Sequence, residues 1–359
     1  MKALSLLFLF LLVSCGKNAE IKQDDFARLN KILGNKVTSS DDYASVVQII
    51  FKTHQGQNFS SCSGTVICSG TKSCRSSKKV KTSAHCFLSE GNLTMMLQSI
   101  SNEMAVSLAP PKMYGQTFAI SKFAILAQAK RSLINHINQF YGDIVIRSQK
   151  NRKIREHKIA SITMEPKWID FYAALITAGF MNDATLAAQL MSQSEVLAGQ
   201  DQAYVELQKP ISDVKIYPVA SVQEVKDHLT EGQKITIAGW GINQDDFNFG
   251  VVPFGLNGAH PINNKRLETE VKVRLGLDQN NFFYVGEFKD WWFGINAYQN
   301  GACSGDSGGG AFMKINGQIK HIGTITSIQN GLCGTPIAVT PDGKEHHPTN
   351  QFHTRILAW

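Results

Sequence analysis

Apolar residues recur every three or four positions in two stretches of the chain, and this period predicts amphipathic α-helices. One helix is predicted over residues 122–139 with Ser121 as its N-cap, and the other over residues 184–197 with Asp183 as its N-cap. Their apolar positions are Leu126, Leu133, Ile134 and Ile137 in the first helix and Leu186, Leu190 and Leu197 in the second. We expect both apolar stripes to face a core within an inserted helical layer.

A strand is predicted to begin at Asp143, because Ile144 and Ile146 point to one face after the turn at residues 141–142. Residues 150–158 then hold five basic residues and one Glu. Such a charge run is typical of a solvated strand or loop, and we favour that interpretation over a site for an anionic partner.

The first fourteen residues have the pattern of an export signal. Lys2 precedes an apolar run from Leu4 to Val13, which is shorter than the about 20 residues of a membrane-spanning helix. The run ends at Leu-Val-Ser-Cys-Gly, residues 12–16, which resembles the lipobox of bacterial lipoproteins. The resemblance implies that residues 1–14 are removed and that Cys15 is acylated, which would anchor the exported chain to a bacterial membrane. The alternative is an ordinary signal with an unrelated cysteine.

Composition narrows the class of protein. The chain has 359 residues, of which 43% are hydrophobic and 18% charged, so it can bury a full core, and disordered, collagen-like and disulfide-miniprotein classes are excluded. A formal net charge of +7 is mild for this length and does not by itself indicate nucleic acid as a partner. The cysteine count is odd, at seven. Six remain if Cys15 is acylated, and these allow fifteen pairings.

A serine within a glycine-rich segment is the strongest candidate for chemistry. Ser307 lies in Gly305–Gly310, where glycines let main-chain N–H groups approach a ligand closely. The amides of Gly305 and Ser307 are placed to bind a developing oxyanion. His85 supplies a candidate general base, which a serine hydroxyl needs in order to act as a nucleophile.

Five segments together resemble the chymotrypsin family of serine proteases. Gly-Asp-Ser-Gly-Gly (305–309) matches its GDSGG signature, and Thr-Ser-Ala-His-Cys (82–86) is similar to its TAAHC motif. The others are Cys62–Ile67, Gly239–Gly241 after a strand at 235–238, and Thr354–Ile356, in the order of the family. The resemblance implies an all-β fold of two six-stranded antiparallel barrels over residues 32–359, with a Ser-His-Asp triad between them.

The acid of the triad has two candidates. Asp201 begins a segment similar to the family's "DIALLKL..P" strand and lies 39 residues before Trp240, the separation that the family usually shows. Asp143 begins Asp-Ile-Val-Ile, which is locally even closer to that motif. We favour Asp201, whose carboxylate would orient His85 and stabilise its imidazolium.

The family resemblance also implies disulfides. It pairs Cys62 with Cys86 and Cys303 with Cys333. Cys68 and Cys74 are then left over, and the turn-rich residues between them favour a local third bridge. We expect no metal site and no cofactor, because the chain is exported and has no Cys-x-x-Cys pairs.

Lys31-Ile32-Leu33-Gly34-Asn35 resembles the activation junction of the family. The resemblance implies that another protease cuts after Lys31 and that the new Ile32 ammonium pairs with Asp306. Residues 15–31 then form a tether, and because Cys15 is their only cysteine, activation would also release the protein from its lipid. The alternative is that residues 29–33 are simply the end of a tether.

Counting within the family pattern places the specificity pocket. Its floor falls at Gly301, and its other positions fall at Ser327–Gln329 and Gln351. A preference for Lys or Arg needs a carboxylate at the floor, so the resemblance implies a preference for uncharged side chains.

The stretch between His85 and Asp201 is longer than the family needs, and we expect insertions roughly within 92–140 and 169–200. Between them, residues 158–168 resemble the strand and "HP.Y" corner that precede the catalytic Asp, with Glu165 in place of His. The sequence thus predicts a lipid-anchored serine endopeptidase that acts on peptides or proteins. The hypothesis from another class is a binding lipoprotein of the same fold whose cleft is occluded.

Overall fold

The structure is a computed structural model of the chain. It describes residues 41–52, 56, 58–68, 74–88, 100, 102, 104, 121–139, 143–192, 199–241, 266–285, 287–290, 296–300, 302, 305–328 and 354–358. The chain forms two compact units, one built from segments that include Phe87–Phe140 and Met164–Asp201, the other containing all the strands of two barrels.

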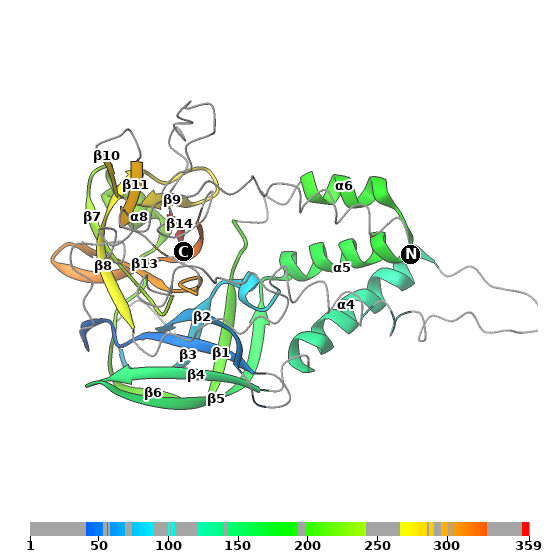
Figure 1. Cartoon of the computed structure of the whole chain (residues 1–359), viewed down its shortest axis with the longest axis horizontal. Coiled ribbons are helices and arrows are strands. Elements are labelled where there is room, and N and C mark those ends of the chain that lie inside the picture. The colour runs from blue at the N-terminus through cyan, green and yellow to red at the C-terminus, as the bar shows by residue number, and fades with distance from the viewer. Residues whose placement is uncertain are drawn as a thin grey trace, which may run out of the picture. The chain divides into compact units, whose positions relative to one another are not determined.

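The fold is the predicted pair of closed, six-stranded antiparallel barrels (Figure 1). The first has the order β1-β2-β3-β6-β5-β4. Its strands are β1 (Val46–Lys52), β2 (Asn58–Ile67), β3 (Cys74–Thr82), β4 (Asp143–Lys150), β5 (Lys153–Met164) and β6 (Ala203–Ile216). Short 3₁₀ turns, η1 (Asp41–Tyr43) and η2 (Ala84–Cys86), precede β1 and follow β3.

The second barrel has the order β12-β13-β14-β9-β8-β7. Its strands are β7 (Lys234–Gly239), β8 (Leu267–Leu275), β9 (Phe282–Val285), β12 (Gly310–Ile315), β13 (Gln318–Ile328) and β14 (Thr354–Ala358). A separate hairpin is formed by β10 (Glu287–Asp290) and β11 (Asn296–Asn300). Helix α8 (Val222–His228) begins with a capping box, in which Ser221 and Glu224 each accept a backbone N–H of the other.

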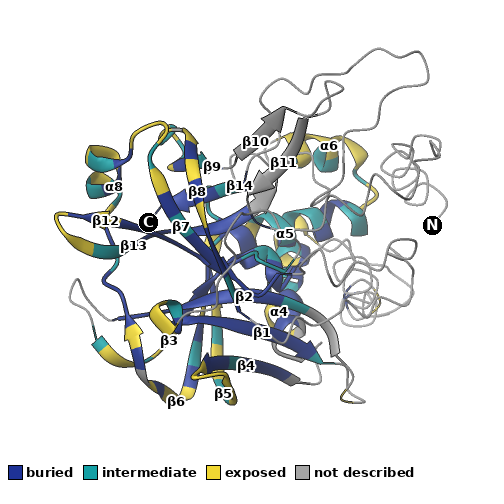
Figure 2. Cartoon of the chain, turned by 60° about the vertical axis from the view of Figure 1, so that its left-hand side comes forward, coloured by how far each residue is buried: buried dark blue, intermediate teal, exposed yellow. Residues whose placement is uncertain are grey.

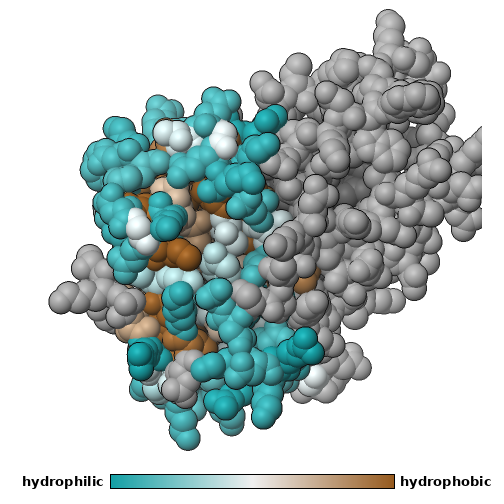
Figure 3. All heavy atoms as spheres, turned by 90° about the vertical axis from the view of Figure 1, so that its left-hand side faces the viewer, coloured by the Kyte–Doolittle hydropathy of each residue, from teal (hydrophilic) through white to brown (hydrophobic). Residues whose placement is uncertain are grey.

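The first strand is buried on both faces, because it lines one barrel and packs against the other (Figure 2). Val46 belongs to a buried cluster with Trp240 and Phe312 of the second barrel. The indole N–H of Trp240 donates to the Val46 carbonyl at 3.1 Å. The junction therefore combines apolar burial with a satisfied polar group, as a buried tryptophan requires. The face in Figure 3 is mostly hydrophilic, with hydrophobic residues gathered in its middle.

The helical unit contains α4 (Lys122–Gln139), α5 (Pro166–Phe180) and α6 (Ala184–Ser192), with α5 in contact with both others (Figure 1). Both predicted N-caps are confirmed: Ser121 Oγ accepts from the Ala124 amide at 3.2 Å, and Asp183 Oδ1 from the Leu186 amide at 2.9 Å. The second helix ends at Ser192, and Leu197 lies outside the described residues.

The predicted apolar stripes are only partly correct. In α4 the buried apolar positions are Ile125, Ala129, Leu133 and Ile137, spaced four apart, whereas Ile134 is 42% exposed. The expectation placed weight on large residues and overlooked Ala129, whose small side chain suits a close helix contact. In α6 no residue is fully buried, and Leu186 and Leu190 are half-buried in a helix that contacts α5.

The strand predicted within residues 158–168 is confirmed, but the corner predicted after it is wrong. The strand β5 continues to Met164, and Pro166 then starts the 15-residue helix α5, with Glu165 as its N-cap residue. Proline is favoured in the first turn of a helix, where its missing N–H costs nothing. The buried positions Trp168, Ile169, Ala173, Ile176 and Thr177 have helical spacing, and this signal was present in the sequence.

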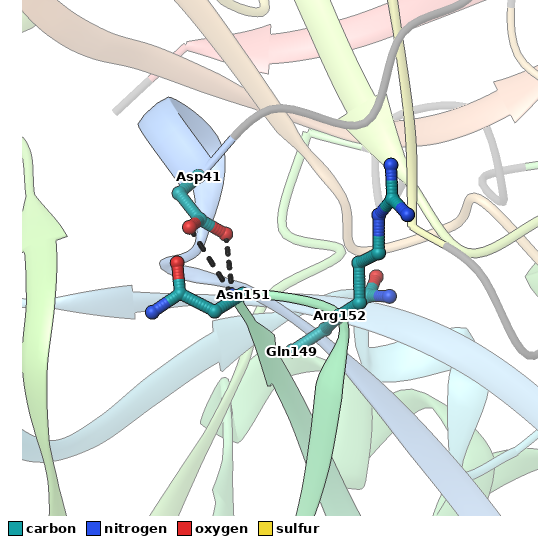
Figure 4. A pocket seen from close by; sticks show the side chains of 4 residues that line it. All are labelled: Asp41, Gln149, Asn151 and Arg152. Atoms are coloured by element: carbon teal, nitrogen blue, oxygen red, sulfur yellow. Dashed lines mark hydrogen bonds between the residues drawn. The ribbon is translucent and has the colours of Figure 1, made fainter.

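The strand predicted at Asp143 is confirmed as β4, and residues 150–158 form the solvent-exposed hairpin of β4 and β5. Its turn places Asn151 (φ 50°) and Arg152 (φ 61°) in the left-handed region. Both carboxylate oxygens of Asp41 accept the Asn151 amide, at 2.9 and 3.1 Å (Figure 4). A hollow of about 310 Å³ lies here, lined by Asp41, Gln149, Asn151 and Arg152.

Two predicted disulfides are present, Cys62–Cys86 and Cys68–Cys74. Disulfides persist in oxidising compartments, so they indicate an exported or extracellular protein. Cys303 and Cys333 lie outside the described residues, as does Cys15. Among the helices that the structure describes, none is both long and apolar enough to span a bilayer.

Two basic side chains are buried near the barrel junction. His321 stacks on Phe312 with ring centroids 5.1 Å apart, and it is 1% exposed. Burial, helped by the charge of Lys81, lowers the pKa of His321 to about 3. Lys81 is also 1% exposed, and burial lowers its pKa well below the ordinary value.

The buried histidine predicts acid sensitivity. Between about pH 6.5 and 3 the unfolded chain binds a proton at His321 that the folded protein does not, so stability falls as pH falls through this range. The loss should approach about 4 kcal/mol at pH 3. Denaturant unfolding between pH 7 and 3.5 measures it. In His321→Gln this part of the pH dependence should disappear, whereas His228→Gln, on the surface helix α8, should keep it. Identical slopes in the wild type and His321→Gln would contradict the prediction.

Candidate active site

The loop that carries Ser307 precedes β12 and depends on two glycines. Gly305 and Gly308 have φ values of +91° and +84°, which favour glycine. The Gly308 amide donates to the Ile325 carbonyl at 2.7 Å, and the Ile325 amide donates to the Gly309 carbonyl at 2.9 Å. The loop is thereby bonded on one side to β13. Ser307 itself is half-exposed, as a side chain that meets a substrate must be.

On its other side the loop is bonded to Ser63 of β2. The Ser63 amide donates to the Ser307 carbonyl at 2.8 Å, and its hydroxyl donates to the Gly305 carbonyl at 2.8 Å. The same hydroxyl accepts the Trp240 amide at 2.8 Å. Ser63 is fully buried, so these bonds are shielded from water. One residue of the first barrel therefore fixes the backbone on both sides of Asp306.

Asp306 lies under the turn at residues 239–241. The Gly241 amide donates to its Oδ1 at 2.6 Å. A Cβ on Gly239 would lie 2.1 Å from that oxygen, and one on Gly241 would lie 2.4 Å from the carboxyl carbon. Both glycines of the Gly-Trp-Gly motif are therefore required by the close approach of Asp306. Ile32, its predicted partner after activation, lies outside the described residues, as does Lys31.

His85 lies in η2, directly after β3, and this turn is held beside the Ser307 loop. Thr82 Oγ1 donates to the Ser63 carbonyl at 2.7 Å, and Ser83 Oγ donates to the Ile325 carbonyl at 3.0 Å. Cys86, bridged to Cys62, has its Sγ 3.7 Å from the Ser307 carbonyl oxygen. The residues on both sides of His85 are thus attached to the elements that hold Ser307. His85 is half-exposed.

Asp201 is 4% exposed and lies two residues before the start of β6. Ala203, the first residue of β6, pairs with Thr82, the last of β3. The chain therefore leaves Asp201 two residues from the position opposite Thr82. Asp143 instead pairs with Lys52 on β1, and its strand β4 is not adjacent to β3. This topology favours Asp201 over Asp143 as the partner of His85.

The predicted specificity pocket lies largely outside the described residues. Gly301, Gln329 and Gln351 are not among them, and Ser327 is described only as a residue of β13 that pairs with Arg355. Within the part of the chain that the structure covers, no group of three His, Cys, Asp or Glu side chains is arranged to hold a metal ion.

Sequence reasoning missed the supporting residues Ser63, Thr82 and Ser83, although all three fall inside or beside the quoted motifs. A signal was available, because a small hydroxyl residue within or beside a buried strand needs a hydrogen-bond partner. The groups that these hydroxyls bond are backbone carbonyls of the second barrel or of β2. These carbonyls are far away in the sequence, so only the folded structure identifies them.

Comparison with protein-family models finds no match for this chain, and comparison with curated proteins finds none either. Function is therefore inferred from the site and the fold.

The close packing of the Ser307 loop predicts a large difference between two glycines of the second barrel. A Cβ at Gly308 would lie 2.0 Å from Thr82 Oγ1 and 2.1 Å from the Ser63 carbonyl oxygen, whereas one at Gly317 would meet open space. Both glycines have positive φ, +84° and +82°. Alanine is disfavoured in this left-handed region, so both variants should lose about 1–2 kcal/mol of stability. We expect Gly308→Ala to lose about 3 kcal/mol more than Gly317→Ala, because it also forces a buried clash. Denaturant unfolding of the disulfide-intact chain measures both, and equal losses would contradict the packing.

Proposed function

We propose that this protein is an exported serine endopeptidase of the chymotrypsin-like class. The observation that carries the proposal is the attachment of the His85 turn and the Ser307 loop to the same residue, Ser63, at the junction of two six-stranded barrels. Such attachment is what nucleophilic catalysis requires, because a serine and its base must be held in fixed relative positions.

In the proposed mechanism, Ser307 attacks the scissile carbonyl while His85 accepts its proton. The amides of Gly305 and Ser307 bind the oxyanion, and Asp201 keeps His85 in the correct tautomer. His85 then protonates the leaving amine, and water hydrolyses the acyl-enzyme by the same steps. The bonds from Ser63 to the carbonyls of Gly305 and Ser307 support this role, since they restrain the loop that carries both amides.

The finer parts of the proposal come from the sequence. Acylation of Cys15 would attach the exported chain to a bacterial membrane, and cleavage after Lys31 would free the Ile32 ammonium to pair with Asp306. Gly301 provides no carboxylate at the pocket floor, so uncharged side chains are the preferred substrates. Self-cleavage after Lys31 is then unfavourable, and a second protease performs it.

Labelling with a fluorophosphonate tests the catalytic proposal. Chain cleaved after Lys31 should be labelled, Ser307→Ala should not, and Asp201→Asn should react about 10⁴-fold more slowly because His85 loses its orienting partner. Asp143→Asn is the matched control and should react within about twofold of wild type. Labelling rates measured by mass spectrometry decide between the two aspartates. Absence of labelling in correctly processed, folded wild type would reject the enzyme and favour an occluded binding protein.

Cleavage after Lys31 predicts that the mature chain carries no covalent lipid. Residues 16–31 contain no cysteine, so no disulfide can link the acylated N-terminus to a chain that begins at Ile32. Intact mass measurement of the active form should therefore show no lipid, and Lys31→Gln should accumulate as uncleaved, lipid-bearing, unlabelled protein. Active enzyme that begins at Ile32 and still carries covalent lipid would contradict the coupling of activation to release.

A further inference from the structure

Positive charge is concentrated on three neighbouring strands of the first barrel. The strands β3, β5 and β6 together contain nine Lys and Arg residues against three Asp and Glu residues, a net of +6. The whole chain has a formal net charge of +7. Most of the formal excess charge therefore belongs to these three strands, which are consecutive in the barrel, although one of their nine basic residues is the buried Lys81.

The barrel brings exposed cations of these strands together. Ser77 pairs with Ile211 and Lys79 with Glu206, so the irregular register between them places Lys78 opposite residues 207–210. Gln208 Nε2 donates to the Ile159 carbonyl at 3.1 Å, which joins β6 to β5 next to Lys158. Neighbouring strands are about 4.8 Å apart. We use the name basic surface for the exposed residues Arg75, Lys78, Lys79, Arg155, Lys158 and Lys209.

Three acidic residues, Glu156, Glu206 and Asp213, lie on the same strands as the basic surface. Glu156 is occupied by Arg147, whose Nε and Nη2 each lie 2.8 Å from its Oε1. Glu206 is in register with Lys79. Across the described segments, none of the six residues of the basic surface forms an ion pair. Like charges on neighbouring strands repel one another in the free protein, and an anionic surface would relieve that repulsion.

We propose that the basic surface binds the anionic phospholipid headgroups of the membrane to which the protein is exported. Its cations are long, flexible and spread over three strands, which suits a diffuse anionic surface better than a small ligand. The disulfides indicate a compartment where the protein meets membranes and not nucleic acid. The proposal does not depend on catalysis.

The position of the basic surface has a consequence for the protein's orientation. The basic surface extends along β3 from Arg75, about 23 Å from Thr82, to Lys79, about 10 Å from Thr82, next to which the Ser307 loop is held. Contact at the Arg75 end of β3 would therefore leave the Ser307 loop open to solution. Stable anchoring to a membrane generally takes two signals. The basic surface would be the second signal, besides the acyl chain.

Vesicle flotation tests the proposal with the chain from residue 16 onwards, so that neither the apolar run of residues 4–13 nor an acyl group contributes. The probes are vesicles of phosphatidylcholine alone and of phosphatidylcholine with 30% phosphatidylglycerol, at about 0.1 and 0.5 M salt. The double variant Lys158→Glu/Lys209→Glu removes charge from the basic surface. The matched control, Lys226→Glu/Lys314→Glu, changes the same charge at exposed positions of α8 and β12.

We expect binding to the anionic vesicles only, weakened at high salt. The double variant on the basic surface should bind about 25-fold more weakly or worse, since each cation near an anionic surface contributes about fivefold. The control should bind within about threefold of the parent chain. Failure of the parent to bind anionic vesicles, equal losses in both doubles, or tighter binding to a DNA duplex than to the vesicles would each overturn the proposal. Labelling by fluorophosphonate is measured in a separate experiment. If it rejects the proposed enzyme, the vesicle result still decides whether the basic surface binds membranes.

Discussion

The candidate site depends on one constraint, which is that the backbone of the Ser307 loop must be held by a residue from the other barrel. Ser63 meets it with two hydrogen bonds to carbonyls of the loop, while its own carbonyl accepts Thr82 and its hydroxyl accepts the Trp240 amide. The loop is rich in glycine, which gives its backbone unusual freedom, so hydrogen bonds from outside the loop must restrict it. The barrels must therefore pack in one register for the site to exist, and the buried contact of Trp240 with Val46 sets that register.

The sequence was informative wherever a motif combined several constraints at once. Glycines at positive φ, glycines that leave room for Asp306 and a disulfide-bonded cysteine directly after His85 leave few alternatives, and these segments lie where the double-barrel prediction needs them. The order of strands around the first barrel places β6, and not β4, beside β3. No local sequence pattern contains this information. That adjacency gives Asp201 its advantage over Asp143.

Prediction was weakest where burial is decided by partners far along the chain. Ile134 is exposed and Ala129 buried, because the contact face of α4 is set by its neighbouring helix and not by the size of its apolar residues. The helix α5 was missed since its start resembles a familiar strand corner, although Pro166 and the helical spacing of Trp168, Ala173 and Ile176 were visible. The charge of residues 150–158 looked unremarkable for the same reason, since β3 and β6 supply the rest of the basic surface.

The two disulfides are nested, with the six-residue separation of Cys68–Cys74 inside the 24-residue separation of Cys62–Cys86. Closing the inner ring costs about 1 kcal/mol less chain entropy than closing the outer one. Once closed, it holds the ends of β2 and β3 together and so brings Cys62 and Cys86 near their final spacing. Loop entropy alone therefore favours closing the bridge at the hairpin's tip before the bridge at the His85 turn. The bridge favoured to close second is the one that ties Cys86, directly after His85, to β2, so a chain kept in a reducing compartment would lack the covalent support of the His85 turn.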